Sequence, residues 1–209
     1  MVKSPSDRKE HWEAVYNRLE PHQTSWYQER PDLSLLLIER SGLPADRPLI
    51  DIGGGASTLV DHLLALNYSD ISILDVSLAA LDKAKARLGQ RAAAVNWITA
   101  DVTSFEAKRT FALWHDRAVF HFLVDAVDRE RYRSALDDGL ETGGQLVIST
   151  FALDGPEKCS GLEIVRYDAA SLARELGPGY HLEEQARESH HTPAGAIQRF
   201  GFYRFTKVA

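Results

Sequence analysis

The sequence predicts an α/β protein with a doubly wound, mostly parallel sheet that ends in a C-terminal antiparallel hairpin. Two observations carry this prediction. From residue 48 onward, short apolar runs alternate with helical patterns, and the first run ends in the glycine turn Gly53-Gly54-Gly55. Two long strand patterns, 180–188 and 198–207, then follow one another directly. Alternating strands and helices form parallel pairs with helices on both faces, whereas two successive strands form an antiparallel pair.

The bulk properties are those of one globular domain. The 209 residues are 44% hydrophobic and 26% charged, and the net charge of −6 argues against a nucleic-acid surface. No run approaches the roughly 18 apolar residues of a membrane span, and residues 1–10 lack the apolar core of a signal peptide. Cys159 is the single cysteine, which excludes an internal disulfide and a cysteine-built zinc site. We therefore expect a cytoplasmic protein without a metal, a monomer or homodimer that binds neither nucleic acid nor membrane.

An N-terminal helical cap over residues 1–44 is predicted to precede the main domain, residues 45–209. Its first helix is predicted at 7–19 with Ser6 as the cap, and its second at 32–40. An aromatic loop joins the two helices. The aromatic side chains that this segment offers to a ligand are Trp12, Tyr16, Trp26 and Tyr27.

The main domain alternates regularly up to residue 150. Asn67 and Gly89 are predicted to end two of its helices, because both residues tolerate the left-handed conformation. The segment 151–165 is longer than the usual connection, which makes it a candidate functional loop. Strands are predicted at 48–52, 71–74, 95–98, 111–114 and 145–150, and helices at 58–66, at 78–88 after Ser77, from Asp128 to about 140, and from Asp168 to 176.

The carboxyl ends of these strands should carry the ligand, because open α/β sheets bind ligands at that edge. The dinucleotide fingerprint G-x-G-x-x-G fits Gly53 and Gly55, but Thr58 stands at the third glycine position. An acid, Asp51, also lies two residues before Gly53. A pyrophosphate disfavours a carboxylate there, whereas a cation favours it. S-adenosylmethionine carries an ammonium and a sulfonium and no phosphate, so it fits this pattern better than NAD does.

Acids at the next two strand ends extend this prediction. Asp75 is expected to accept from the ribose hydroxyls, Asp101 to accept from the adenine amino group, and the Val102 amide to donate to a ring nitrogen. Asp51 is expected to face the charged end of the cofactor, directly or through water. Taken alone, Asp75 or Asp101 is explained equally well as a capping residue. Together, at the ends of the two strands that follow the glycine turn, the two acids favour cofactor binding. The expected cofactor-binding residues are Asp51, Gly53, Gly54, Gly55, Asp75, Val76, Asp101, Val102, Trp26 and His115.

Together, Asp51-Ile52-Gly53-Gly54-Gly55, Asp75 and Ala100-Asp101-Val102 resemble the motifs of the class I S-adenosylmethionine-dependent methyltransferases. The resemblance covers about residues 45–207. It implies a seven-stranded Rossmann-like sheet of order 3-2-1-4-5-7-6 and S-adenosyl-L-methionine as the cofactor. Ser57 departs from the family pattern, because a third glycine is common at that position.

The residues after the fourth strand are the candidates for catalysis, since the resemblance places reactive groups there. His115 is a candidate base, Asp116 a group that orients it or holds a substrate amine, and Arg117 a group that grips a carboxylate. In the alternative reading, Asp116 caps the next helix and pairs with Arg117, while His121 packs in the core.

The substrate side is predicted from the N-terminal cap and the long loop. Aromatic rings attract cationic groups and exclude water, so the N-terminal aromatic residues are a candidate lid. Two of them, Trp12 and Tyr16, have the alternative role of anchoring their helix. Cys159 is a candidate thiol, although a lone cysteine is more often inert packing. His190 and His191 are neighbours on a strand, so at most one of them should face a site. The expected substrate-binding residues are Trp12, Tyr16, Tyr27, His121, Cys159, Arg166 and His191.

These features predict a methyltransferase that acts on a small molecule by in-line displacement. A protein lysine methyltransferase is an alternative, with Trp26, Tyr27 and Asp116 forming a channel that carries an acid. A non-catalytic module that only binds S-adenosylmethionine is a second alternative. Asp51 and Thr58 argue against an NAD-dependent oxidoreductase.

Overall fold

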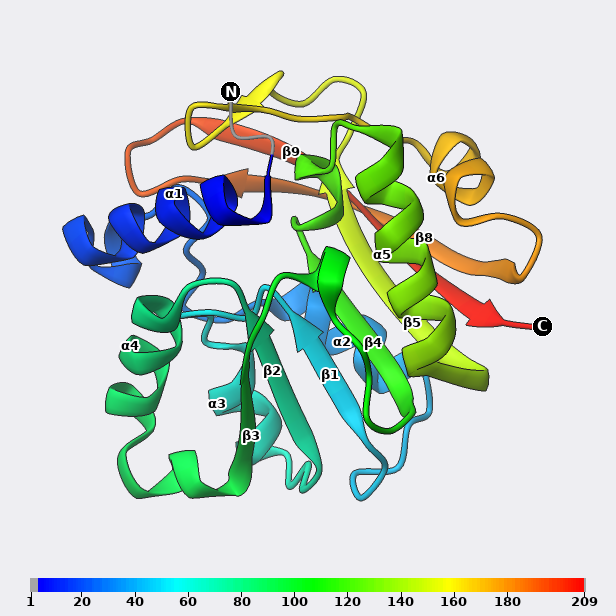
Figure 1. The fold of residues 1–209 in the computed structure, drawn as a ribbon, viewed down its shortest axis with the longest axis horizontal. Coiled ribbons are helices and arrows are strands. Elements are labelled where there is room, and N and C mark those ends of the chain that lie inside the picture. Colours follow the sequence, from blue (N-terminus) through cyan, green and yellow to red (C-terminus); the bar gives the residue numbers. More distant parts are fainter. Residues whose placement is uncertain (1–3, 209) are drawn as a thin grey trace.

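The computed structural model describes residues 4–208. Residues 1–3, the start of the stretch considered above as a signal peptide, lie outside this range, as does residue 209. A seven-stranded sheet of order β3-β2-β1-β4-β5-β9-β8 forms the centre of the molecule (Figure 1). The strands are β1 (Leu49–Ile52), β2 (Ile71–Asp75), β3 (Val95–Thr99), β4 (Phe111–Arg117), β5 (Leu140–Phe151), β8 (Tyr180–His191) and β9 (Ile197–Lys207), with a separate short pair, β6 (Lys158–Cys159) and β7 (Leu162–Glu163).

This order confirms the predicted doubly wound sheet with an antiparallel edge. Strands β3, β2, β1, β4 and β5 pair in parallel, and β9 runs antiparallel to both β5 and β8. The chain moves outward from β1 to β2 and β3 and then returns to β4 on the other side of β1. The ends of β1 and β4 therefore frame the switch point, where ligands bind in this architecture.

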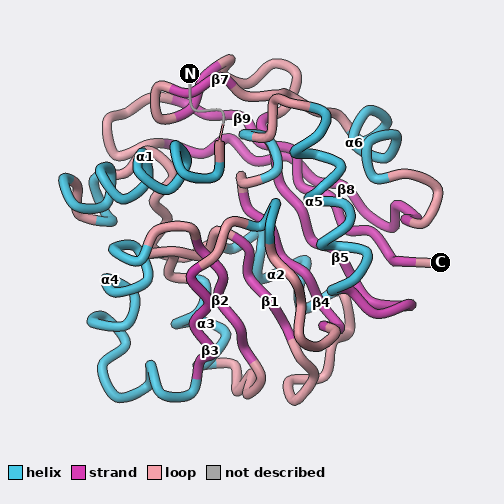
Figure 2. Tube along the Cα trace, viewed as in Figure 1, coloured by secondary structure: helices cyan, strands magenta, loops and turns pink. Residues whose placement is uncertain are grey.

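Helices cover both faces of the sheet, and each face has its own apolar layer. Leu136 of α5 and Leu172 of α6 pack with Trp114 on one face, while Leu37 of α2 and Leu63 of α3 pack with the other face. Figure 2 shows α1 and β7 above the edge where β1 and β2 end. Within the described range, no helix has both the length and the apolar character to cross a bilayer. The helices are α1 (Pro5–Arg18), α2 (Asp32–Arg40), α3 (Leu59–Ala65), α4 (Leu78–Leu88), α5 (Ala126–Gly139) and α6 (Ala169–Leu176).

Two predicted helix caps are wrong by a few residues. Helix α1 is capped by Ser4 instead of Ser6, because Pro5 suits the first helical turn and Ser4 forms a capping box with Asp7. In helix α5 the N-cap position is Asp125, whose side chain forms no capping hydrogen bond, and Asp128 lies in the first turn. The side chain of Asp128 is therefore available for a contact with another part of the chain.

Strand β4 is longer than predicted. It continues past Trp114 to Arg117, and a short 3₁₀ turn at Phe120–Phe122 follows it before α5. Because successive side chains of a strand point to opposite faces, His115 and Arg117 share one side of the sheet and Asp116 points to the other. The three consecutive candidates for catalysis therefore do not face one site.

Candidate functional site

A cavity opens at the carboxyl ends of the parallel strands, between the sheet and α1. It contains about 840 Å³ of atom-free space, part of which is open to solvent. Six of the ten residues expected to bind the cofactor line it: Gly53, Asp75, Val76, Asp101, Val102 and Trp26.

The glycine turn after β1 brings the main chain close to two side chains of the site. Gly53 has a φ of +65°, and an added Cβ would lie 2.1 Å from Cγ2 of Val119. Gly55 has a φ of +41°, and a Cβ there would lie 2.6 Å from Oδ2 of Asp75. A side chain at either position would collide with the cavity wall, so the turn requires glycine there.

Asp75 ends β2 as a buried acid beside the glycine turn. Its Oδ1 accepts a hydrogen bond from the Ser77 amide at 2.8 Å, and the side chain also lines the cavity. Burial raises the pKa of Asp75 to about 7, and the nearby charges of Asp51 and Glu13 add to this rise. Donors that approach from a ligand would favour the ionised form and lower this pKa again.

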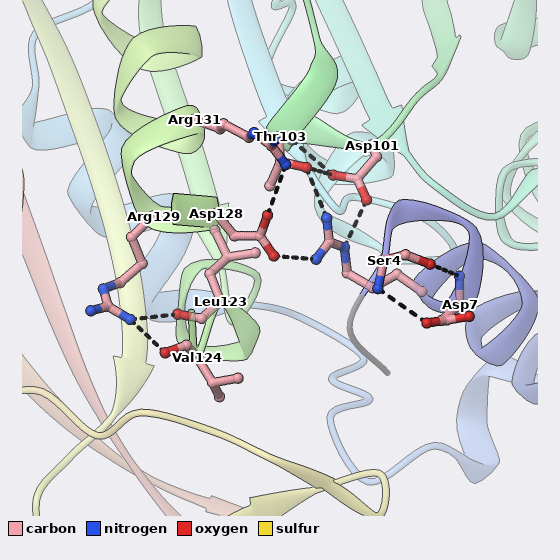
Figure 3. A network of polar contacts seen from close by, with 10 residues as sticks. Ser4, Asp7, Asp101, Thr103, Leu123, Val124, Asp128, Arg129 and Arg131 are labelled. Atoms are coloured by element: carbon pink, nitrogen blue, oxygen red, sulfur yellow. Dashed lines mark hydrogen bonds and ion pairs between the residues drawn. The ribbon is translucent and has the colours of Figure 1, made fainter. Parts of the chain in front are cut away.

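Asp101 is held by a residue that the sequence analysis did not single out, Arg8 of α1. Arg8 Nε donates to Asp101 Oδ2 and Arg8 Nη1 to Asp128 Oδ2, both at 2.7 Å, and Arg8 Nη2 donates to Thr103 Oγ1 at 2.8 Å. Figure 3 shows Asp101, Thr103 and Asp128 as members of this polar network. Burial alone would raise the pKa of Asp101, but the hydrogen bonds from Arg8 and Thr103 outweigh burial and hold it below its usual range. We call this group of Arg8, Asp101, Thr103 and Asp128 the Arg8 clasp.

Aromatic side chains from the N-terminal segment cover the cavity. The Trp12 and Trp26 rings meet edge to face with their centroids 5.6 Å apart, and Trp26 Nε1 donates to the Tyr16 hydroxyl at 3.3 Å. Trp12 also packs against Phe122, at 5.2 Å. Trp12, Tyr16, Trp26 and Phe122 all line the cavity, so three of the four residues of the predicted lid lie at this site.

His115 and Asp51 occupy different positions from those expected. His115 Nδ1 lies 2.6 Å from Asp51 Oδ1, and Nε2 lies 2.9 Å from Ser34 Oγ of α2. Both side chains are buried, and neither lines the cavity. His115 therefore has no access to act as the expected base or cofactor contact. Asp51 lies behind Gly54, where an added Cβ would be 2.5 Å from its Oδ2, so it supports the turn from behind.

Asp116 is also corrected, because it faces α5. Its carboxylate accepts hydrogen bonds from the amides of Val119 and Phe120 and from the Tyr132 hydroxyl. Burial raises its pKa to about 6, and the hydrogen bond from Tyr132 opposes this rise. Asp116 therefore has the capping contacts of the alternative interpretation, but the pairing with Arg117 that this interpretation also expected is not found among the described residues.

Arg117 and Cys159 do line the cavity. Arg117 Nη1 donates to the Trp26 carbonyl at 3.0 Å, and its guanidinium lies 5.5 Å from the ring centroid of Phe200. Burial raises the pKa of the Cys159 thiol to about 12, which the nearby Arg117 charge only partly opposes. The thiol is therefore neutral near pH 7, and this supports inert packing over an activated nucleophile.

Four other residues expected on the substrate side do not line this cavity. His121 is fully buried, its Nδ1 accepts from the Phe151 amide at 3.2 Å, and burial lowers its pKa to about 3. Arg166 donates to the Gly155 carbonyl and tethers the long loop. Tyr27 lines a smaller neighbouring pocket. Of the histidine pair, His191 is exposed and His190 faces inward, with Nε2 2.8 Å from the Ser25 carbonyl.

Several residues that line the cavity were not predicted from the sequence, although the spacing of one of them, Arg8, pointed to the site. Arg8, Trp12 and Tyr16 recur every four residues, which places all three on one face of α1. Val119 and Phe122 follow the end of β4, which lies three residues further along the chain than the strand was predicted to reach. Phe200 comes from β9, and nothing local relates it to the glycine turn.

We expect the replacement His115→Leu to lower the free energy of unfolding by about 3 kcal/mol, because it leaves Asp51 buried without its partner. Urea denaturation near pH 7 measures this change. The same measurement on His181→Leu, at an exposed position of β8, serves as the control. Equal stability of the two variants would show that the Asp51–His115 contact does not support the fold.

The Arg8 clasp predicts a pH-dependent loss of stability. Arg8→Met should lower the free energy of unfolding by about 3 kcal/mol at pH 7, because two carboxylates lose their common partner. The folded-state pKa of Asp101 is depressed, so its stabilisation is present above the unfolded pKa and disappears as the pH falls below about 4. The gap between wild type and variant should therefore narrow on acidification. Arg131→Met, which removes an exposed partner 3.5 Å from Asp128, should change stability by less than about 0.5 kcal/mol.

Residues 49–144 match the model of a family described as a methyltransferase domain. The matched segment begins at β1 and ends within β5, so it contains the glycine turn, Asp75, Asp101 and β4. The comparison with curated proteins finds no match.

Solved structures share the fold over nearly the whole chain. An S-adenosylmethionine-dependent methyltransferase from Anabaena variabilis is 17% identical with a TM-score of 0.74, and the alignment covers 95% of this chain and 94% of that one. The 1,6-didemethyltoxoflavin N1-methyltransferase of Burkholderia thailandensis, solved with 1,6-didemethyltoxoflavin and S-adenosylhomocysteine, is 15% identical with a TM-score of 0.75 and coverages of 100% and 92%. The N-methyltransferase NodS of Bradyrhizobium japonicum, solved with S-adenosylhomocysteine, is 18% identical with a TM-score of 0.71 and coverages of 93% and 97%.

Identities this low show the fold alone, whereas the family match covers the glycine turn and the acids that follow β2 and β3. The chain therefore has the Rossmann-like fold of the class I S-adenosylmethionine-dependent methyltransferases, and a little under half of it is similar to a methyltransferase domain.

Proposed function

We propose that this chain is an enzyme that transfers a methyl group from S-adenosyl-L-methionine to a small-molecule acceptor by in-line displacement. The observation that carries the proposal is that one cavity joins two kinds of surface. Asp75 and Val102 lie on the side of β2 and β3, and Arg117, Cys159 and Phe200 lie at the ends of β4, β6 and β9. The first surface suits an adenosine, and the second leaves room for an acceptor.

The side chains at β2 and β3 fit the adenosine part of the cofactor. Asp75 would accept from the ribose hydroxyls, since it is a buried acid at the end of the second strand. Asp101 already accepts three hydrogen bonds, from Arg8 and from the amide and hydroxyl of Thr103. We therefore assign the adenine contact mainly to Val102 and its apolar neighbours, and we assign Asp101 to holding α1 in place.

The glycine turn and the aromatic residues fit the methionine part. When bound, the cofactor supplies a methyl group that its sulfonium charge has already activated. Trp12, Tyr16 and Trp26 would attract this cationic end and keep water away from it. Gly53 lets the main chain approach the ligand without a side chain between them.

The described residues that line the cavity suit the alignment of an acceptor better than the removal of a proton from it. No histidine is among the described residues that line it, since His115 and His121 are buried elsewhere. Burial raises the pKa values of Tyr16 and Cys159, so both groups keep their protons near pH 7. This chemistry favours an acceptor atom whose lone pair is already free near neutral pH, because alignment alone then drives the displacement.

Of the two alternative functions, the protein lysine methyltransferase loses support and the non-catalytic module does not. A protein lysine acceptor required an acid in the channel, and Asp116 faces α5 instead of the cavity. A non-catalytic module would use the same cofactor contacts, so only a turnover measurement distinguishes it from the enzyme.

The cofactor assignment predicts proton release on binding. In the cofactor-free protein the pKa of Asp75 is about 7 because of burial, and accepting hydrogen bonds from a ribose would lower it. S-adenosylhomocysteine should therefore bind with release of protons at pH 6.5 and with almost none at pH 8.5. Calorimetry in two buffers of different ionisation enthalpy measures the number of protons.

Asp75→Asn should abolish this release and weaken S-adenosylhomocysteine binding about tenfold or more, because the charged acceptor is lost. Asp82→Asn, on the same side of the fold in α4 and paired only with Lys85 among the described residues, is the matched control. Binding of NAD in place of S-adenosylhomocysteine, or unchanged proton release in Asp75→Asn, would contradict the assignment.

A further inference from the structure

Arg117 carries a buried positive charge that the described chain leaves mostly unpaired. Its Nη1 donates to the Trp26 carbonyl, but Nε and Nη2 are buried and have no hydrogen-bond partner within residues 4–208. An arginine stays charged at every physiological pH, even where burial lowers its pKa as it does here. Burying such donors without an acceptor is unfavourable, so the position requires an explanation.

Neighbouring acids do not supply that acceptor. The charges of Glu188 and Asp51 act on Arg117 from a distance, but neither acid forms an ion pair with it among the described residues. Asp51 instead contacts His115, and one oxygen of Glu188 accepts from Gln28 at 2.9 Å. The second oxygen of Glu188 is itself buried without a partner.

The position of Arg117 points to a ligand. It lines the main cavity together with Cys159 and Phe200, and it also lines the smaller pocket that contains Ser57 and Thr58 after the glycine turn. Phe200 and the Trp26 carbonyl fix the guanidinium from two sides. The side chain is thus held in place before any ligand arrives, with two donors still to be satisfied.

We propose that Arg117 binds a carboxylate of a ligand in this cavity through Nε and Nη2. These two nitrogens form one edge of the guanidinium, and such an edge matches the two oxygens of a carboxylate in a bidentate pair. The carboxylate has two chemical sources, the methionyl group of the cofactor or the acceptor itself. The inference rests on the proposed function, and it adds an anionic subsite at the end of β4.

The first experiment compares two cofactor-like ligands. S-adenosylhomocysteine has the carboxylate, whereas 5′-methylthioadenosine keeps the adenosine and the thioether and lacks it. If the cofactor is the source, Arg117→Gln should weaken S-adenosylhomocysteine about tenfold or more and 5′-methylthioadenosine less than about threefold. Arg109→Gln, which removes an exposed arginine near the opposite end of β4, is the charge-matched control and should change neither affinity.

The second experiment tests the acceptor as the source. Benzoate and its uncharged isostere benzamide are titrated into protein saturated with S-adenosylhomocysteine, and Trp fluorescence or NMR shifts report binding. If the acceptor supplies the carboxylate, wild type should bind benzoate about tenfold more tightly than benzamide, and Arg117→Gln should abolish the preference. Arg117→Lys keeps the charge but not the planar edge, so it should lose most of the effect even if Arg117→Gln folds poorly.

Either positive arm supports the proposal and names the source of the carboxylate. If neither ligand series depends on Arg117, and Glu188→Gln lowers stability as much as Arg117→Gln does, the residue serves a long-range ion pair and the proposal is overturned. Failure of the wild type to bind S-adenosylhomocysteine at all would instead reject the proposed function, so the two failures are distinguishable.

Discussion

The contact between His115 and Asp51 joins the two central strands where both of them end. The two residues are register partners in β1 and β4, so backbone pairing places them side by side, and His115 Nδ1 lies 2.6 Å from Asp51 Oδ1. Asp51 supports the glycine turn from behind, since Gly54 packs against its carboxylate. The contact also shows which side of the sheet the side chain of His115 points to. Two residues further on, Arg117 therefore returns to the same side and reaches the cavity.

Helix α1 converts the open edge of the sheet into an enclosed site. Arg8 fastens one end of it to Asp101 and Asp128, and Glu13 fastens the middle by accepting from the first two amides of α4, at 2.7 and 3.2 Å. Trp12 and Tyr16 lie on the helix between and beyond these attachments. The charge-assisted contacts of Arg8 are buried or partly buried, and those of Glu13 are more exposed. Together they hold in place the helix that covers the cavity. This partly enclosed cavity is one basis of our proposal that the acceptor is a small molecule.

Local patterns predicted most of the fold. Helices α2 and α4, the Ser77 cap and the left-handed Asn67 all follow from short-range signals. The alternation of elements predicted a mostly parallel sheet with an antiparallel edge, whereas the order of the strands came from the resemblance to the methyltransferase family. Asp75 and Val102 were found because strand ends meet at one edge. The end of β4 was not found, because a run of His, Asp and Arg looks like a loop until its pairing with β1 and β5 is known. The partnership of Arg8 with Asp101 spans 93 positions, and no local signal reports such a contact.

We propose above all that the protein transfers a methyl group to a small molecule bound in this cavity. The most direct measurement incubates the purified protein with S-adenosylmethionine labelled in its methyl group and a cell extract separated into small-molecule and protein fractions. The account predicts that label appears in the small-molecule fraction, together with an equal amount of S-adenosylhomocysteine. Label in the protein fraction alone would contradict the acceptor class, and cofactor binding without any transfer to either fraction would contradict catalysis.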